Sequence, residues 1–344
     1  MKKSAPDGLA KTLGQGFRDK DTLVSQITRH IQHAPDLNDE DRNPYCIHPS
    51  EAAKGDAWCT RATYYRMTDA PADPAPRKLA FEMVFERGHD AHNKWQTWLW
   101  EMDLLWGMWE CLYCDLYWWD KSPYECPRCE SGRKRIRYRE VPVSSEEYLL
   151  AGQADGLIDR PIEVKSIGPG TVRIEAPALL KKYSYEHTDD EGKKHTGTDW
   201  YQLWQGIRRP WPSHIRQGMI YCFCAGWKSM TFIYDPKFLT AWPKEFEVKF
   251  RKDLIEDTLE QCLTIKNALE KGRPPKRPMW ANQSHASCKA CPYRGTCYAK
   301  RGDRRPGEEA RSAEYRSEGE AGEGEPRSTR PSKVRYSESP AGHY

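Results

Sequence analysis

Four cysteines lie at opposite ends of this chain, and they limit how it can fold. Cys59 is near the start, whereas Cys288, Cys291 and Cys297 form a C-x2-C-x5-C pattern near the end. Four thiolates can share one metal centre, a zinc ion or an iron–sulfur cluster, only if the fold brings both segments together. The pattern therefore predicts a clip that closes around the residues between its ends. These residues alone do not choose between the two metals.

The composition limits the size of the fold and its compartment. With 344 residues, of which 38% are hydrophobic, the chain can form one large core or one core with a small module. It contains no apolar run long enough for a membrane helix or a secretory signal, so we expect a cytoplasmic protein without a membrane partner. Thiols stay reduced in that compartment, and metal binding is the expected use of those among the 12 cysteines that cluster.

A second cysteine set lies within one short segment. Cys111 and Cys114 form one C-x2-C pair, and Cys126 and Cys129 form another. Two such pairs at this separation are the ligand set of a zinc ribbon, in which the zinc is structural and closed to substrates. The sequence therefore predicts a zinc-ribbon-like insert over residues 107–132. Its role would be binding or scaffolding, with DNA or a partner protein as the target.

Basic and aromatic residues gather around this insert. The net charge of +4 is too small to indicate a nucleic-acid-binding protein by itself. A strand, however, would place four arginines on one face, namely Arg133, Arg135, Arg137 and Arg139. Such a face is equally compatible with phosphate contacts and with a solvated sheet edge. The 14 tryptophans could stack on unpaired bases, although most tryptophans in any protein are core residues.

Hydrophobic periodicity predicts the elements around the insert. We expect helices over residues 22–31, 78–105, 213–225 and 253–271, and another around Cys59. We expect strands over residues 136–143, 148–158, 161–167, 229–234 and 246–250, and a loop over residues 188–198. Together they predict an α/β fold with a mixed central sheet flanked by helices.

Two acids and a lysine lie on neighbouring predicted strands. Asp155 is expected in the middle of one strand, and Glu163 and Lys165 share a face of the next. A tight turn at Asp159 and Arg160 would bring that face beside Asp155. Paired carboxylates suit Mg²⁺ or Mn²⁺, which lowers the pKa of a bound water and neutralises charge on a phosphate. Lys165 would orient or help deprotonate that water. Taken alone, the pattern also fits a solvated hairpin.

Two helical pairs extend this set. Gly88 precedes His92 by one turn, which would let another backbone or a ligand approach the helix closely. His89, on the same helix, is a competing histidine. Gln217 and Tyr221 are four residues apart, so an amide and a phenol share one helical face. Each pair also has an ordinary packing explanation when it is considered singly.

Taken in order, these motifs resemble the RecB-type branch of the PD-(D/E)xK nuclease superfamily, in particular the CRISPR-associated exonucleases of spacer acquisition and their phage-encoded relatives. The resemblance covers residues 47–298 and keeps every motif in the family's order. It implies a restriction-endonuclease-like fold. The chain then divides into a polar N-terminal lead (1–43), the first part of the nuclease domain (44–106), the ribbon-like insert (107–132), the nuclease core with the iron–sulfur segment (133–300) and a disordered tail (301–344).

The resemblance also implies roles for individual residues. The catalytic Mg²⁺ or Mn²⁺ would be held by His92, Asp155, Glu163 and the carbonyl of Val164, with Lys165 as the catalytic lysine. Gln217 and Tyr221 would help to position DNA or the active site. A 4Fe-4S cluster would be held by Cys59, Cys288, Cys291 and Cys297, and a structural zinc would be held by the insert.

The implied function is that of a metal-dependent deoxyribonuclease. We expect an exonuclease that acts on single-stranded DNA or duplex ends, in recombination, phage DNA processing or spacer acquisition, with a recombination or integration protein as a further partner. A different hypothesis is a non-catalytic nucleic-acid-binding or assembly protein that uses the ribbon on a nuclease-like scaffold. The filled catalytic positions favour the enzyme. RNA is a third option, because the chemistry acts on the phosphate and not on the base.

Overall fold

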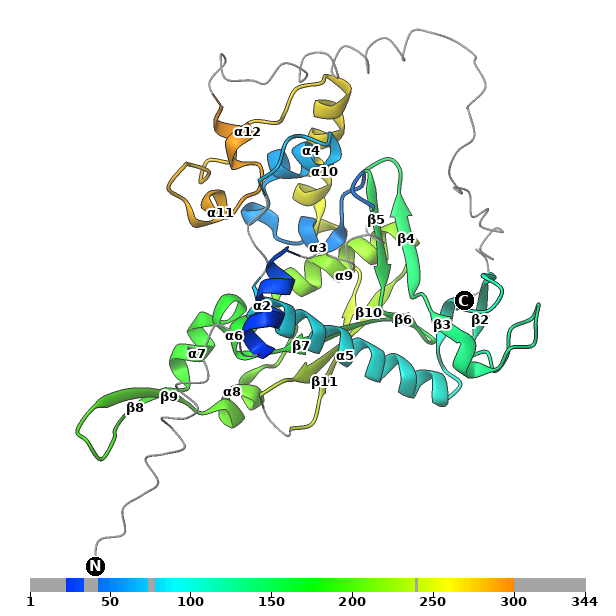
Figure 1. The fold of residues 1–344 in the computed structure, drawn as a ribbon, viewed down its shortest axis with the longest axis horizontal. Helices are drawn as coiled ribbons and strands as arrows, with labels where there is room; N and C mark the ends of the chain where they lie inside the picture. The colour runs from blue at the N-terminus through cyan, green and yellow to red at the C-terminus, as the bar shows by residue number, and fades with distance from the viewer. Residues whose placement is uncertain (1–22, 34–42, 74–77, 239–240, 300–344) are drawn as a thin grey trace, which may run out of the picture. The chain divides into compact units, whose positions relative to one another are not determined.

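The computed structural model describes residues 23–33, 43–73, 78–238 and 241–299, which form a mixed α/β fold (Figure 1). Its helices are α2 (Leu23–His33), α3 (Pro49–Ala52), α4 (Thr60–Met67), α5 (Leu79–Glu101), α6 (Pro169–Glu175), α7 (Pro177–Lys182), α8 (Trp200–Gly206), α9 (Pro212–Ala225), α10 (Glu256–Glu270), α11 (Ala286–Lys289) and α12 (Arg294–Tyr298). Its strands are β1 (Trp106–Cys111), β2 (Tyr117–Lys121), β3 (Ile136–Tyr138), β4 (Val141–Ser145), β5 (Leu150–Ala154), β6 (Gly156–Leu157), β7 (Pro161–Ile167), β8 (Ser184–Thr188), β9 (Lys194–Thr198), β10 (Ser229–Pro236) and β11 (Lys244–Lys249). The predicted α/β class, a mixed central sheet flanked by helices, is confirmed.

One central sheet of seven strands organises the molecule. Its order is β11-β10-β7-β6-β1-β2, and β3 pairs with β1 beside this path. The β7–β10 pair is parallel and the other pairs are antiparallel. Parallel neighbours need a crossover connection, which here contains helices α6 to α9 and the β8–β9 hairpin. Helix α5 packs against β7, while α9 packs against β10 and the separate β4–β5 pair.

The core fills the space between α9 and the sheet. Its largest buried side chains include Trp204, Phe232 and Tyr234. Gly218 lets α9 approach β10, because a Cβ at this position would lie 2.5 Å from Cζ of Phe232. Gly226 then ends the helix in a left-handed conformation with φ of 71°.

Segments from both ends of the described chain lie together. Helix α4 packs against α10, and Figure 1 shows α12 beside them. Hydrogen bonds join the two ends directly: Arg61 Nη1 donates to the Pro275 carbonyl at 2.8 Å, and Thr296 Oγ1 donates to the Pro71 carbonyl at 2.7 Å. The N-terminal and C-terminal segments of the described chain are therefore in contact, as the clip prediction requires.

The strand predicted over residues 136–143 is interrupted, and the arginines before it form no common strand face. Arg133–Arg135 form a 3-10 turn, and β3 begins only at Ile136. The guanidinium of Arg133 stacks on the Trp100 ring, with its Cζ 4.2 Å from the centroid. Glu140 has φ of 60°, so it cannot continue β3 into β4. The prediction of four arginines on one face was wrong because side-chain stacking and this local turn override the alternating pattern.

Three other predictions need correction. Asp155 lies in a bend between β5 and β6, and these two strands belong to different sheets. The predicted loop over residues 188–198 is largely the turn and second strand of the β8–β9 hairpin, in which the Asp189 carboxylate accepts the amides of Glu191 and Lys193. Gly88 is not approached closely, because Lys237 Nζ, 4.0 Å from a Cβ built there, is the nearest neighbour found.

Within the described ranges, no helix combines the length and apolarity needed to cross a lipid bilayer. The expected tail over residues 301–344 and most of the expected polar lead lie outside the described residues, and the helix predicted over residues 22–31 is α2.

Replacing Gly218 by alanine should destabilise the fold by about 1–2 kcal/mol. The added methyl group meets Phe232 and Met230, and such overpacking costs more than the gain in helix propensity returns. Urea unfolding of the parent and the variant measures the difference. Gly170→Ala in α6 is the matched control, since a Cβ there meets nothing within 4 Å. Equal stability of Gly218→Ala and the parent would contradict the close packing of α9 on β10.

Candidate active site and metal centres

Asp155 and β7 meet as the sequence predicts. The carboxylate of Asp155 accepts the Val164 amide at 2.6 Å between Oδ2 and N, across the turn in which the Ile158 amide bonds to the Arg160 carbonyl. Both acids are buried, with 5% of Asp155 and 1% of Glu163 exposed. A solvated hairpin, the alternative for this pattern, is therefore excluded.

Glu163, Lys165 and Gln217 form a closed hydrogen-bonded ring. Lys165 Nζ donates to Glu163 Oε1 at 2.6 Å and to Gln217 Oε1 at 2.9 Å. Gln217 Nε2 in turn donates to Glu163 Oε1 at 2.8 Å and lies 3.0 Å from the Tyr221 hydroxyl. Helix α9 thus supplies the amide that holds the acid and the lysine of β7 in one orientation.

One carboxylate oxygen of this ring has no partner. Glu163 Oε2 is buried and makes no hydrogen bond within the described residues. A buried acceptor without a donor is unfavourable by about 1–3 kcal/mol, and more if it is charged. A cation at this oxygen would remove that penalty, so the orphaned oxygen fits a metal ligand.

His92 reaches the acids from α5, and His89 does not. His92 Nδ1 lies 3.3 Å from Asp155 Oδ1, whereas His89 is exposed on the helix surface. Gln96, one turn further along α5, donates to the Asp155 carbonyl at 2.9 Å. The long helix therefore contributes both a candidate ligand and a residue that positions the bend containing Asp155.

Glu140 joins this site, although no motif in the sequence indicates it. Ligand atoms of His92, Glu140 and Asp155 all lie within 4.8 Å of one another. Gln96 Nε2 also lies 3.2 Å from Glu140 Oε1. The sequence signal for Glu140 is an acid that follows a run of arginines, but the alternating pattern over residues 136–143 predicts one continuous strand. The turn at Glu140 is what directs its carboxylate to Asp155.

The predicted metal set is therefore divided between two neighbouring groups. His92 and Asp155 gather with Glu140, whereas Glu163 is held by Lys165 and Gln217. Val164 is buried between the acids and donates its amide to Asp155.

The electrostatics reflect several charges buried close together. Burial, with repulsion from Asp155, raises the pKa values of Glu140 and Glu163 to about 7. Burial alone would also raise the pKa of Asp155, but His92 and Lys165 outweigh it and the pKa is lowered. Burial opposes the charge of His92, yet Asp155 raises its pKa to about 9. The pKa of Lys165 is likewise raised, because its two acidic neighbours outweigh burial. The site is thus short of positive charge, as a metal site is before it binds its ion.

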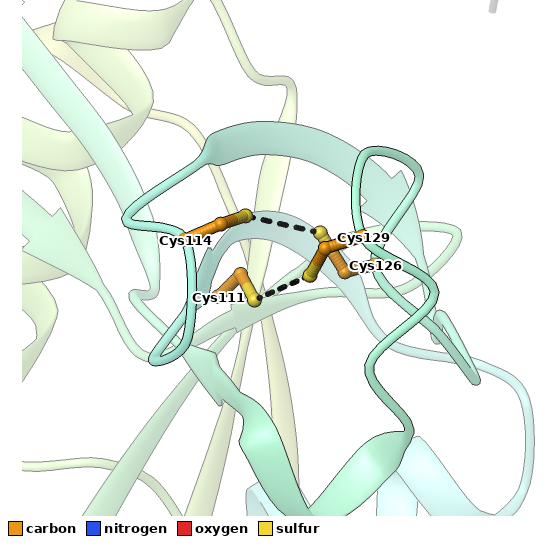
Figure 2. Close-up of side chains that lie close together, drawn as sticks. All are labelled: Cys111, Cys114, Cys126 and Cys129. Carbon is orange, nitrogen blue, oxygen red and sulfur yellow. Dashed lines mark hydrogen bonds between the residues drawn. The ribbon is translucent and has the colours of Figure 1, made fainter.

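The ribbon (residues 107–132) has the geometry of a single four-thiolate metal site. Cys111 Sγ lies 3.6 Å from Cys129 Sγ, and Cys114 Sγ lies 3.6 Å from Cys126 Sγ. Figure 2 shows the four side chains converging from two facing turns. Zinc–sulfur bonds of about 2.3 Å in a tetrahedron separate the sulfurs by about 3.8 Å. The four cysteines can therefore hold one metal ion such as zinc.

The clip (Cys59, Cys288, Cys291 and Cys297) is arranged differently. Its four cysteines line one cavity of about 420 Å³, between the N-terminal and C-terminal segments. Over the described ranges, they do not form a set with sulfurs all within 4.8 Å, as the ribbon does. Arg277 Nε donates to Cys297 Sγ at 3.4 Å, and the Tyr298 hydroxyl donates to Cys288 Sγ at 3.7 Å.

Comparison with known proteins assigns no family. No family model matches the chain, and no curated protein matches it. Among solved structures, the alkaline exonuclease LHK-Exo from Laribacter hongkongensis is similar with a TM-score of 0.37, at 13% identity over 66% of this chain and 89% of the other. LHK-Exo in complex with dAMP gives a TM-score of 0.36, at 10% identity and the same coverage. The structure of SSO0001 gives 0.31, at 12% identity over 86% of this chain and 99% of the other. Values this low assign no function, and the function proposed below rests on the side chains described above.

The affinity of the site for Mn²⁺ should rise as the pH is raised from about 6 to about 9. Metal ions compete with protons for these ligands, and the pKa values of about 7 for Glu140 and about 9 for His92 mean that both lose protons through this range. Isothermal titration calorimetry at several pH values measures the change. Glu140→Gln should weaken binding by at least about tenfold. The exposed Glu186→Gln serves as the control, and equal affinities for the two variants would contradict a role of Glu140 as a ligand.

Proposed function

We propose that the protein is a metal-dependent deoxyribonuclease of PD-(D/E)xK type that hydrolyses phosphodiester bonds as an exonuclease, in single-stranded DNA or at duplex ends. The observation that carries the proposal is the closed ring of Glu163, Lys165 and Gln217 beside Asp155 and His92. A structural ion pair would need only one acid and the lysine. Glu140, Asp155 and Glu163 carry more negative charge than His92 and Lys165 neutralise. One oxygen of Glu163 also has no hydrogen-bond partner among the described residues.

The donor set suits a hard divalent cation. His92, Glu140, Asp155 and Glu163 would hold Mg²⁺ or Mn²⁺, with carboxylate oxygens as the main ligands. Such an ion, when bound, lowers the pKa of a water molecule and neutralises charge on the phosphate. Glu140 is added here to the ligands that the resemblance implies, since its carboxylate lies with the imidazole of His92 and the carboxylate of Asp155.

Lys165 would act as a fixed cation. Its pKa is raised by Glu163 and Asp155, so it stays protonated at neutral pH and can donate to a phosphate oxygen or to the attacking water. Glu163, with a pKa of about 7, is better suited to accept a proton. Gln217 would position both groups through its amide, and Tyr221 stays neutral, because burial raises its pKa well above the usual value.

The clip would hold a 4Fe-4S cluster, and the ribbon a structural zinc. A cavity of about 420 Å³ lined by four cysteine side chains that do not converge on one point fits a cluster of several irons better than it fits a single ion. The cluster would join α4 to the segment that contains α11 and α12, and so hold the first and last parts of the domain together.

The second candidate function is a non-catalytic nucleic-acid-binding or assembly protein that works through its ribbon. It is favoured by the ribbon strands, which are part of the central sheet rather than an appendage. DNA that is bound but left uncut would support it. Roles in recombination, phage DNA processing or spacer acquisition, with a protein partner, all require action at free DNA ends. The assay with end-labelled DNA described next examines this action.

Lys165→Ala should lower the cleavage rate by at least about 100-fold, because it removes a cation from the reacting phosphate. The assay follows end-labelled single-stranded DNA, duplex DNA and RNA with Mn²⁺ or Mg²⁺, using protein purified without oxygen, and labels at each end report the polarity. Lys249→Ala, an exposed lysine on β11, is the control. If folded, metal-loaded parent protein binds DNA without cutting it, the nuclease proposal is wrong and the assembly function replaces it.

Cys291→Ser should abolish the broad visible absorption of an iron–sulfur cluster and lower the melting temperature by roughly 5–10 °C, because metal binding contributes directly to folding. Cys224→Ser, a half-buried cysteine outside both metal sets, should change neither property. An unchanged melting temperature for Cys291→Ser would rule out the clip as a stabilising staple. Zinc in place of iron in the purified protein would overturn the 4Fe-4S assignment.

A further inference from the structure

Strands β1, β2 and β3, here called the ribbon sheet, have one side that carries aromatic and basic residues outside the hydrophobic core. In β1, β2 and β3, directly opposed residues point to the same side. The register pairs Trp106 with Lys121, Met108 with Trp119, and Glu110 with both Tyr117 and Arg137. We call this side the ribbon face; it consists of Trp106, Met108, Glu110, Tyr117, Trp119, Lys121 and Arg137.

The other side of the same strands forms a separate hydrophobic cluster. Trp109 and Ile136 are buried there, with Trp118 and Tyr138 packed against them. This cluster also includes Leu99 and Trp100 at the end of α5, which anchors the ribbon sheet to the long helix. The core of the ribbon sheet is therefore complete without the aromatic rings of the ribbon face.

Two rings of the ribbon face are open to solvent. Tyr117 is 40% exposed and Trp119 is 42% exposed, and both lie on β2, the last strand of the sheet. Large aromatic side chains that remain this exposed while their neighbours form a core mark a binding surface more often than a packing surface. Flat rings two residues apart along a strand are spaced like the stacking positions of proteins that bind single-stranded nucleic acid.

The charge of the surface is complementary to a phosphate backbone. Lys121 and Arg137 belong to the ribbon face, and Arg139 follows at the end of β3. Glu110 is the acid among the residues of the ribbon face; its carboxylate accepts the Tyr117 hydroxyl at 2.8 Å and lies 3.2 Å from Arg139 Nε and 3.9 Å from Arg137 Nη1. Three cations against one acid leave a net positive charge beside the two exposed rings.

The ribbon face is continuous with the candidate active site. The Arg139 amide donates to the Met108 carbonyl at 2.8 Å, and the Met108 amide donates to the Glu140 carbonyl at 3.0 Å. Strand β3 forms one edge of the ribbon face and is followed two residues later by Glu140. The carboxylate of Glu140 lies with the ligand atoms of Asp155 and His92. On the same edge, Trp106 pairs with Leu157, two residues after Asp155. A nucleic-acid strand bound along the ribbon face would therefore extend towards the candidate metal ligands Glu140 and Asp155.

We propose that the ribbon face binds single-stranded DNA, with unpaired bases stacked on Trp119 and Tyr117 and phosphates beside Lys121 and Arg137, and guides the strand to the site at Glu140 and Asp155. The proposal rests on the nuclease function proposed above and adds the part of the substrate that the ribbon recognises. Bases of a duplex are already stacked on one another, so the exposed rings select an unpaired strand.

The test measures binding apart from cleavage. Fluorescence anisotropy with labelled oligothymidylate is recorded for full-length, zinc-loaded Lys165→Ala protein, and for the same protein with Trp119→Ala or Tyr117→Ala added. Each addition should weaken binding by about 5- to 100-fold, the usual contribution of one stacked base. Trp119→Phe should restore part of the loss. Trp242→Ala is the matched control, because Trp242 is 90% exposed away from the ribbon, and circular dichroism with zinc content checks folding.

A second readout separates this proposal from the nuclease proposal. Hydrolysis of bis(4-nitrophenyl) phosphate, which has no bases to stack, is measured in chains that retain Lys165. In Trp119→Ala, oligothymidylate binding should fall by a larger factor than this rate. If the parent hydrolyses neither substrate but Trp119→Ala still weakens binding, the nuclease proposal fails and the ribbon face stands. Three outcomes would overturn the assignment to single-stranded DNA. The first is unchanged binding in both ring variants, and the second is an equal loss of duplex DNA binding. The third is that the parent binds oligouridylate more tightly than oligothymidylate and loses this binding in the ring variants.

Discussion

Asp155, in the bend before β6, and Glu163, on β7, are two buried carboxylates, and much of the surrounding structure neutralises them. A buried charge is stable only when cations and hydrogen-bond donors surround it. β7 provides Lys165 and the Val164 amide, α5 provides His92, and α9 provides Gln217. The elements that pack closest to the sheet are thus the ones that neutralise its acids, so the packing of the core and the chemistry of the site depend on one another. The oxygen of Glu163 that remains without a partner is where this compensation is incomplete, and it is the place at which a bound cation would act.

Two sets of four cysteines, the ribbon and the clip, lie in different parts of the domain. The ribbon cysteines lie at the end of β1 and in the turns that follow it, and the same strand supports Glu140 through the Met108 backbone. The ribbon is therefore mechanically connected to the acid site by hydrogen bonds and is not a separate appendage. The clip cysteines line a cavity elsewhere in the domain, where α4 meets the C-terminal segment.

Much of the fold could be read from the sequence because local signals agree with the tertiary structure. β7 runs over Pro161–Ile167 as predicted, and α9 and α10 differ from their predicted limits by a few residues. A period of two placed Glu163 and Lys165 on one face, and a spacing of four placed Gln217 and Tyr221 together. The C-x2-C pairs likewise located the ribbon site, because a tetrahedral ion constrains ligand spacing more strongly than hydrophobic packing constrains a strand.

The sequence by itself thus determined the mixed α/β class, the ribbon cysteines and the placement of Glu163 and Lys165 on one strand face, since periodicity and ligand spacing are local properties; the contact of Gln217 with both came only from the tertiary structure. Only the tertiary structure decided that Glu140, and not Glu163, gathers with His92 and Asp155. A left-handed turn at Glu140 and a bend at Asp155 interrupt strands that the pattern reads as continuous. It also decided which tryptophans are core and which are exposed, because strand pairing assigns Trp109 and Trp119 to opposite sides of one sheet. Contacts between residues far apart in sequence carry no periodic signal, and the backbone has to close before such contacts can form.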